Sequence, residues 1–137
     1  MLRVNLIKPK KLEALAFTRA DLVRIGAKAI ESVTKRVALG LNEQDRTMKP
    51  LSASYRAKKV KMGQPGIRNM MLSGSMLGAL TVVEADNNHV TVGFTRQAEL
   101  AKASKNQDRS DWFGLSKSDE AKVMFFAGRI LANKTSK

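Results

Sequence analysis

The stretch from Thr18 to Gly40, TRADLVRIGAKAIESVTKRVALG, carries the strongest structural signal in the sequence. Thr18 followed by Asp21 is the capping-box spacing that begins helices. Lys35 and Arg36 fall outside the apolar face, and Gly40 offers a C-terminal stop. A helix of this length is roughly 32 Å long, so we expect it to cross the whole domain. Its predicted buried face, spaced by three and four positions, holds Leu22, Ile25, Ala29, Val33 and Val37.

The sequence after this helix predicts a small antiparallel sheet and a second long helix. Segments 80–85 and 89–94 are strand-like and flank the turn DNN, which predicts a β-hairpin. His89 falls at this turn, where we expect it to face solvent. Ser116 and Asp119 repeat the capping-box spacing in front of a C-terminal helix. A short strand near the N-terminus and a short helix in QAELAKASKNQ complete the predicted elements. The apolar face of the C-terminal helix holds Val123, Phe126, Ala127, Ile130 and Leu131.

The predicted fold class is α+β, with both long helices packed on a small antiparallel sheet. A chain of 137 residues fits a single domain. Residues 1–17 form an N-terminal arm, and residues 132–137 are expected to fray. Residues 41–68, here called the basic excursion, contain two prolines and two glycines and predict a long loop with a short helical turn around 52–59.

The charge balance is the most unusual feature of the composition. Lys and Arg number 25 against 12 Asp and Glu, a net charge of +13. Such an excess attracts nucleic acid, anionic membranes or acidic proteins, and a solvated basic surface is the alternative. Aromatic residues make up only 5% of the chain and no basic stripe alternates with them, which is a weak signal for nucleic-acid readout. The tightest basic clusters are Lys8, Lys10 and Lys11, and Arg56, Lys58, Lys59 and Lys61.

The residue types that enzymes and metal sites need are scarce. There is no cysteine and a single histidine, so we expect no metal site and no cofactor. No phosphate-binding glycine motif occurs, and no nucleophile stands beside a base, so we expect no catalysis. No apolar run approaches the ~20 residues of a membrane span, and the first residues lack a signal-peptide pattern. We therefore expect no membrane partner and no secretory signal.

Two apolar groups lie in unexpected places. Met62, Met70, Met71 and Met76 crowd together, and such a group either fills a core or lines a contact surface. The apolar residues of MMLSGSMLGAL outnumber what one helical turn can bury, which favours protein contact. Trp112 and its neighbour Phe113 lie within the polar stretch NQDRSDWFGLSKSD and must be covered.

We expect this aromatic pair to be held where the C-terminal helix begins. Phe113 and Leu115 should enter the core beside the hairpin. For Trp112 we expect burial within the chain in preference to burial at a subunit contact, and it also counts among the interface candidates.

Four segments in order resemble the tail-completion, or virion morphogenesis, proteins of tailed bacteriophages. They are PLSASYRAKKVKMG (50–63), GIRNMMLSGSMLGALTV (66–82), VTVGF (90–94) and AKASKNQDRSDWFGLSKSD (101–119), followed by a terminal helix to residue 131. The family pattern is an Arg-Asp pair, then Leu-Ser/Thr-Gly-x-Met-Leu, and later Arg-x-x-Trp/Phe-Phe-Gly-hydrophobic-Ser-x-x-Asp. This chain departs from it at Asn69, which replaces the acid after Arg68, and at Asp111 and Lys117, where proline is common.

The resemblance and the charge clusters together give the candidate site residues. The candidate interface comprises Arg56, Lys58, Lys59, Lys61, Arg68, Met70, Met71, Leu72, Met76, Leu77, Arg109 and Trp112. The structural motif comprises Ser73, Gly74, Phe113, Gly114, Leu115, Ser116 and Asp119.

The resemblance implies a structural virion protein without catalysis or cofactor. It implies a subunit of a hexameric ring that completes the tail and joins the tail tube to the head, located in the virion neck and assembled in the host cytoplasm. The implied partners are further copies of the chain and neighbouring neck, connector and tail-tube proteins, with nonspecific contact to passing DNA. Two other functions stay open: a basic nucleic-acid-binding module, and a tail-assembly factor that leaves before maturation.

Overall fold

The computed structural model describes residues 2–5, 17–69, 78–86, 89–96, 98, 101–103, 105, 107 and 112–135 of the chain. Helices pack on a small antiparallel sheet, so the predicted α+β class is confirmed. The elements in chain order are β1 (Leu2–Asn5), α1 (Arg19–Ala38), α2 (Ala53–Lys61), β2 (Thr81–Asp86), β3 (His89–Gly93) and α5 (Lys117–Thr135).

Helix α1 begins and ends where the sequence predicts. The Asp21 backbone N–H donates to Thr18 Oγ1 at 3.1 Å, and the Thr18 N–H donates to the Asp21 carboxylate at 2.9 Å. The C-cap is Leu39, and Gly40 follows with φ of +78°, a left-handed conformation that favours glycine. The predicted buried face is confirmed, because all five of its apolar residues are buried.

The sheet is three-stranded and antiparallel, with the order β1-β3-β2. The predicted hairpin is confirmed as β2 and β3, and β1 adds to the other side of β3. Val82 pairs with Val92 while Glu84 pairs with Thr91, so Val83 is the extra residue of a β-bulge and its side chain is exposed. β3 is the central strand, and it is buried from Val90 onward.

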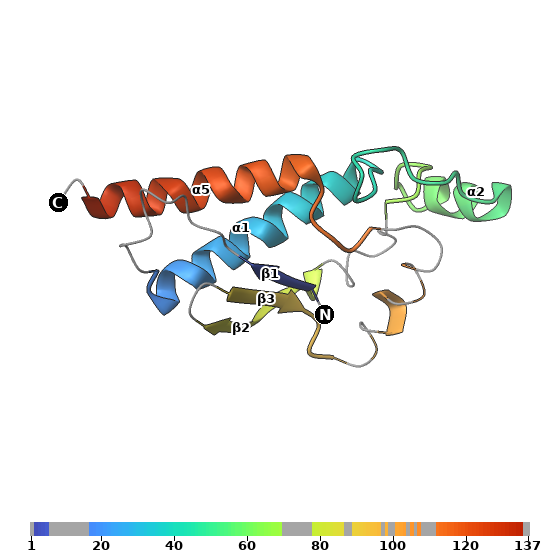
Figure 1. Cartoon of the computed structure of the whole chain (residues 1–137). Coiled ribbons are helices and arrows are strands. Elements are labelled where there is room, and N and C mark those ends of the chain that lie inside the picture. The colour runs from blue at the N-terminus through green and yellow to red at the C-terminus, as the bar shows by residue number, and fades with distance from the viewer. Residues whose placement is uncertain are drawn as a thin grey trace.

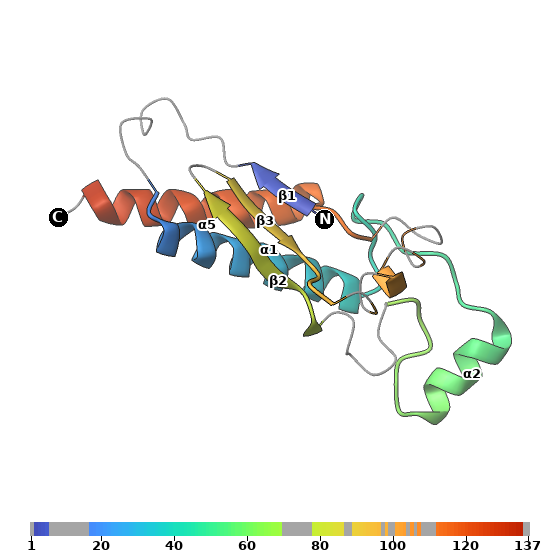
Figure 2. The same ribbon diagram turned by 90° about the horizontal axis from the view of Figure 1, so that it is seen from below.

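Both long helices lie side by side on one face of the sheet (Figures 1 and 2). Two clusters of buried side chains fill the space between the layers. The first joins α1, β3 and α5 and holds Leu22, Ile25, Ala29, Val90, Val123, Ala127 and Ile130. The second lies toward the C-terminal end of α1 and holds Val33, Val37, Met48, Leu80, Phe94, Ala103 and Trp112.

The C-terminal helix is longer than the sequence predicts. α5 continues to Thr135, so the expectation that the chain frays from residue 132 is wrong. The cause is a contact with the start of α1, where Lys134 Nζ lies 2.5 Å from the Asp21 carboxylate. Burial works to raise the pKa of Asp21, but hydrogen bonds from Lys134 and Thr18 outweigh it and leave the pKa below its ordinary value. The same carboxylate thus caps one helix and holds the last turn of the other.

Helix α1 approaches the sheet closely at Gly26. A Cβ atom placed on Gly26 would lie 2.7 Å from a methyl carbon of Val82 and 2.7 Å from one of Val90, a separation that real structures avoid. Gly128 in α5 is the opposite case, because a Cβ there meets nothing within 4 Å. The two glycines therefore make a matched pair for testing this packing.

We predict that Gly26→Ala lowers the free energy of unfolding by up to about 2 kcal/mol, because overpacking costs about 1–3 kcal/mol and the higher helix propensity of alanine offsets about 1 kcal/mol of that cost. Gly128→Ala should raise the same free energy by about 0.5–1 kcal/mol. Urea unfolding followed by circular dichroism measures both. Equal stabilisation by the two substitutions would show that the close approach does not constrain the fold.

Candidate functional site

Trp112 belongs to the chain's own core. Its side chain is 0% exposed, and its ring centroid lies 6.5 Å from that of Phe94 and 5.3 Å from that of Phe113. Phe113 and Leu115 are half-buried and pack against the same cluster, so their predicted position is confirmed. Burial of Trp112 within the chain is confirmed as well. Its place among the interface candidates is wrong, because a fully buried indole is not accessible to a partner.

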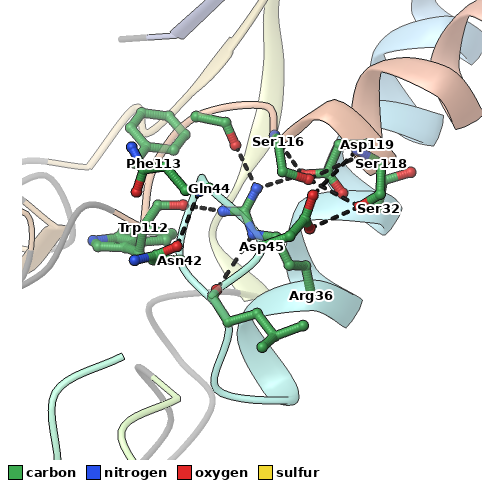
Figure 3. Close-up of polar contacts among 12 residues, drawn as sticks. Ser32, Arg36, Asn42, Gln44, Asp45, Trp112, Phe113, Ser116, Ser118 and Asp119 are labelled. Carbon is green, nitrogen blue, oxygen red and sulfur yellow. Dashed lines mark hydrogen bonds and ion pairs between the residues drawn. The ribbon is translucent and has the colours of Figure 1, made fainter. Parts of the chain in front are cut away.

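A buried arginine organises the aromatic segment (Figure 3). Arg36 is only 4% exposed, so the expectation that it lies on the polar side of α1 is wrong. Its guanidinium forms a buried ion pair with the Asp119 carboxylate. Three further donors bond to backbone carbonyl oxygens, those of Gly114 at 2.8 Å, Leu41 at 3.3 Å, and Trp112. Arg36 therefore joins the end of α1 to the turn after it, the aromatic segment and α5.

The first turn of α5 is capped from two directions. The Asp119 N–H donates to Ser116 Oγ, and the Ser116 N–H donates to the Asp119 carboxylate, both at 3.1 Å, which confirms the predicted capping box. Asp45, in the turn after α1, accepts from the Ser118 hydroxyl at 2.7 Å and from its N–H at 3.2 Å. These hydrogen bonds, the hydroxyl's foremost, hold the pKa of Asp45 below its ordinary value. The motif is thus a folding device that fixes where α5 begins.

Two polar atoms of this network are buried without a hydrogen-bond partner among the described residues. They are Trp112 Nε1 and one oxygen of Asp119, Oδ1. The other Asp119 oxygen carries the contacts to Arg36 and Ser116.

The basic excursion divides into two parts. Its first eight residues stay with the body, because Leu41 bridges to Thr47 and Met48 is buried in the second core cluster. The rest, together with the adjoining Asn69, we call the distal excursion (residues 49–69); it carries α2 and extends beyond the end of α1 (Figures 1 and 2). The helical turn predicted around 52–59 is confirmed as α2, which begins after its N-cap Ser52.

Two basic side chains hold the distal excursion together. Arg68 Nε donates to the Lys49 carbonyl at 2.9 Å, which closes the base of the loop. Lys59 Nζ donates to the Ile67 carbonyl at 2.8 Å and to Asn69 Oδ1 at 2.5 Å. Burial lowers the pKa of Lys59, and the charge of Arg68 lowers it further.

Lys59 is therefore misassigned as an interface residue. Its side chain is 1% exposed, so it is not available to DNA or to another protein. Arg68 is half-buried and braces the loop. The candidate interface keeps Arg56, Lys58 and Lys61, which are exposed on α2.

The outer surface of the distal excursion mixes positive charge with apolar groups. Tyr55, Val60, Met62 and Ile67 are exposed there, Val60 by 57% and Met62 by 52%. A shallow, open hollow on α2 is lined by Leu51, Ala53, Arg56, Ala57, Val60 and Lys61.

A second exposed apolar surface lies on α5 and was missed by the sequence reasoning. Phe125 is 69% exposed, Met124 beside it is partly exposed, and the Arg129 guanidinium lies 6.0 Å from the Phe125 ring centroid. The signal was the spacing of Phe125, which is not three or four residues from any member of the predicted apolar face of the helix. Phe126 takes the inner position, half-buried against the first cluster, with Arg24 over its ring.

Several predicted site residues lie outside the described part of the chain. They are Met70, Met71, Leu72, Ser73, Gly74, Met76, Leu77 and Arg109. Their predicted interface and motif roles stay predictions.

We predict that Arg36→Met lowers the free energy of unfolding by about 3–5 kcal/mol, because it leaves the Asp119 charge buried without its partner. The matched control is Lys35→Met, which removes a neighbouring charge paired with Glu31 at an exposed site. That substitution should change stability by no more than about 1 kcal/mol. Chemical denaturation measures both, and a similar small effect for the two would contradict a central role for Arg36.

We predict that Lys59→Met loosens the distal excursion without unfolding the body. Removing the ammonium frees the Ile67 carbonyl and Asn69 from α2, so amide exchange at Met62 and Gln64, which bond back to α2, should quicken at least tenfold. Hydrogen exchange read by NMR measures this, with exposed Lys58→Met as control. Unchanged exchange in the Lys59 variant would show that other contacts hold the loop.

Comparisons of the chain with protein-family models, with curated proteins and with solved structures find no match. Among the helices of the described part, none has the length and apolar character that crossing a bilayer requires. Within the same residues, no three His, Cys, Asp or Glu side chains gather in a way that could hold a metal ion. The candidate site consists of one buried motif around Arg36 and two exposed surfaces, one on α5 and one on the distal excursion.

Proposed function

We propose that the chain is a structural subunit of a tailed-phage virion, a tail-completion or head–tail connector protein that joins the tail tube to the head as a closed ring. The observation that carries this proposal is the presence of two separate exposed surfaces, each combining apolar and basic groups. One surface is the outer face of α5 around Phe125, and the other is the distal excursion. A subunit within a larger assembly needs distinct surfaces for distinct neighbours.

The order of sequence motifs from residue 50 to 131 supports the same function. In this chain the contacts of the described part of the aromatic motif, Trp112 to Asp119, are made within the chain and stabilise its fold. Its likeness to the phage family therefore supports a shared fold, and the contacts with neighbours fall to the exposed surfaces. The proposed function requires no catalytic residue.

The face around Phe125 is the better candidate for contact between copies. Exposed Phe125 with Arg129 over its ring, and Met124 beside it, are residue types enriched in the cores of protein interfaces. In a ring, this face would meet a different surface of the next copy, because ring contacts are heterologous. We propose a hexameric ring located at the neck of the virion.

The second candidate function is a basic nucleic-acid-binding module. The net charge of +13 favours it, together with the exposed cations Arg56, Lys58 and Lys61. Reversing these three charges tests it directly, with Lys59 left unchanged because it is buried. If reversal abolishes a DNA-dependent activity and leaves particle assembly intact, the result would favour nucleic-acid binding over the neck function.

We predict that the purified protein forms a closed oligomer whose mass is six times the 15.1 kDa of the chain. Phe125→Glu should shift it to monomer, because a buried, unpaired carboxylate is costly at a packed interface. Sedimentation velocity measures the mass, and electron microscopy of particles locates the ring at the neck.

The matched control is Val83→Glu, which places the same charge on an exposed residue of the sheet. It should leave the oligomer intact. A chain that stays monomeric at high concentration and is also monomeric or absent in finished particles would contradict the proposed function.

A further inference from the structure

The distal excursion has no internal source of negative charge. Between Asp45 and Glu84 the sequence contains no acidic residue, while it contains seven Lys and Arg. One of the seven, Lys59, is buried against a carbonyl and an amide oxygen, both uncharged. The remaining charges have no acidic residue of this segment to balance them, and those exposed on α2, Arg56, Lys58 and Lys61, can attract a negatively charged surface from outside it.

The hollow on α2 places apolar and positive groups in a definite arrangement. Ala53, Ala57, Val60 and Leu51 supply apolar lining, and Arg56 and Lys61 supply the two cations of the lining. Ala53, Ala57 and Val60 share one side of the helix because they are spaced by three and four residues. The hollow thus has an apolar lining that includes Ala57 and Val60. In the sequence, Arg56 directly precedes Ala57 and Lys61 directly follows Val60.

We propose that this hollow binds an acidic segment of a neighbouring protein, with an apolar side chain seated on Ala57 and Val60 and carboxylates meeting Arg56 and Lys61. This inference deepens the proposed function and rests on it, since the neighbour would be another protein of the assembly. An apolar anchor between charged contacts is a common arrangement at protein interfaces, where the apolar centre supplies affinity and the charges supply orientation.

A second copy of the chain is the poorer occupant. The chain carries +13, so copies repel one another wherever the basic excursion meets a basic surface. Several carboxylates are also engaged inside the body: Asp21 with Lys134, Glu31 with Lys28 and Lys35, and Asp119 with Arg36. An acidic neighbour of different sequence satisfies the charges of the excursion without this cost.

Duplex DNA is also the poorer occupant. Phosphates would satisfy Arg56 and Lys61, but they offer nothing to the exposed Val60 and Met62. The burial of Lys59 further removes one cation from the cluster that a phosphate backbone would follow. The exposed apolar surface on the excursion points to a protein.

The test uses the full chain and four fluorescent probes. The first is a short capped peptide in which leucines alternate with glutamates. The second replaces its leucines with serine, the third replaces its glutamates with glutamine, and the fourth is a short DNA duplex. Fluorescence anisotropy at physiological salt gives each dissociation constant for the wild type, Val60→Ser, and the double variant Arg56→Gln/Lys61→Gln. Matched controls are Val83→Ser and Lys122→Gln, both at exposed sites outside the excursion.

We expect the leucine–glutamate peptide to bind the wild type at least tenfold more tightly than either substituted peptide. Val60→Ser should abolish the preference for leucine, the double variant should weaken binding at least tenfold, and the controls should do neither. Equal binding of the serine peptide, a preference that survives Val60→Ser, or no peptide binding would each overturn the proposal. Tighter binding of the DNA duplex, lost in the double variant, would overturn it in favour of nucleic acid.

Sedimentation of the same samples separates this inference from the proposed function. Rings that form without peptide binding would contradict the proposed docking site and would still support the proposed ring subunit. Peptide binding by a protein that never forms rings would support the docking site and count against the ring.

Discussion

The guanidinium of Arg36 needs hydrogen-bond acceptors from the protein, because it lies in the interior. Three backbone carbonyls and the Asp119 carboxylate accept from it, so that each of its three nitrogens is hydrogen-bonded. Those acceptors come from the turn after α1, from the aromatic segment and from the first turn of α5. Segments far apart in the chain are thereby joined at one point, and the Lys134–Asp21 ion pair joins α5 to α1 at the opposite end.

The local parts of this arrangement could be read from the sequence, and the long-range part could not. The caps at Thr18 and at Ser116 depend on residues three positions apart, so their spacing predicts them. The ion pair joins positions 36 and 119, whose proximity no local pattern encodes. By spacing, Arg36 lies on the apolar face of α1, three residues after Val33 and seven after Ala29. Only its charge argued for the polar side, and the partners of that charge come from distant segments.

Lys59 shows the same limit for the candidate site. In the sequence it is one of four basic residues in a cluster, and nothing separates it from Lys58 or Lys61. In the structure it is distinguished by Asn69, whose side-chain oxygen accepts a hydrogen bond from the Lys59 ammonium. Because the contact joins α2 to a loop ten residues away, the difference between a structural lysine and a surface lysine appears only once the loop is closed.

The positive charge of the surface is related to where the carboxylates lie in the fold. Asp21, Asp45 and Asp119 are engaged in helix caps and ion pairs within the body, so their charges are largely neutralised or directed inward. The cations that balance no internal acid are left on the surface, and on the distal excursion they lie beside exposed Val60 and Met62. The hydrogen bonds of Lys59 and Arg68 close the excursion, and both go to uncharged oxygen atoms. The proposed contact with an acidic neighbour would cover this apolar area and balance this charge.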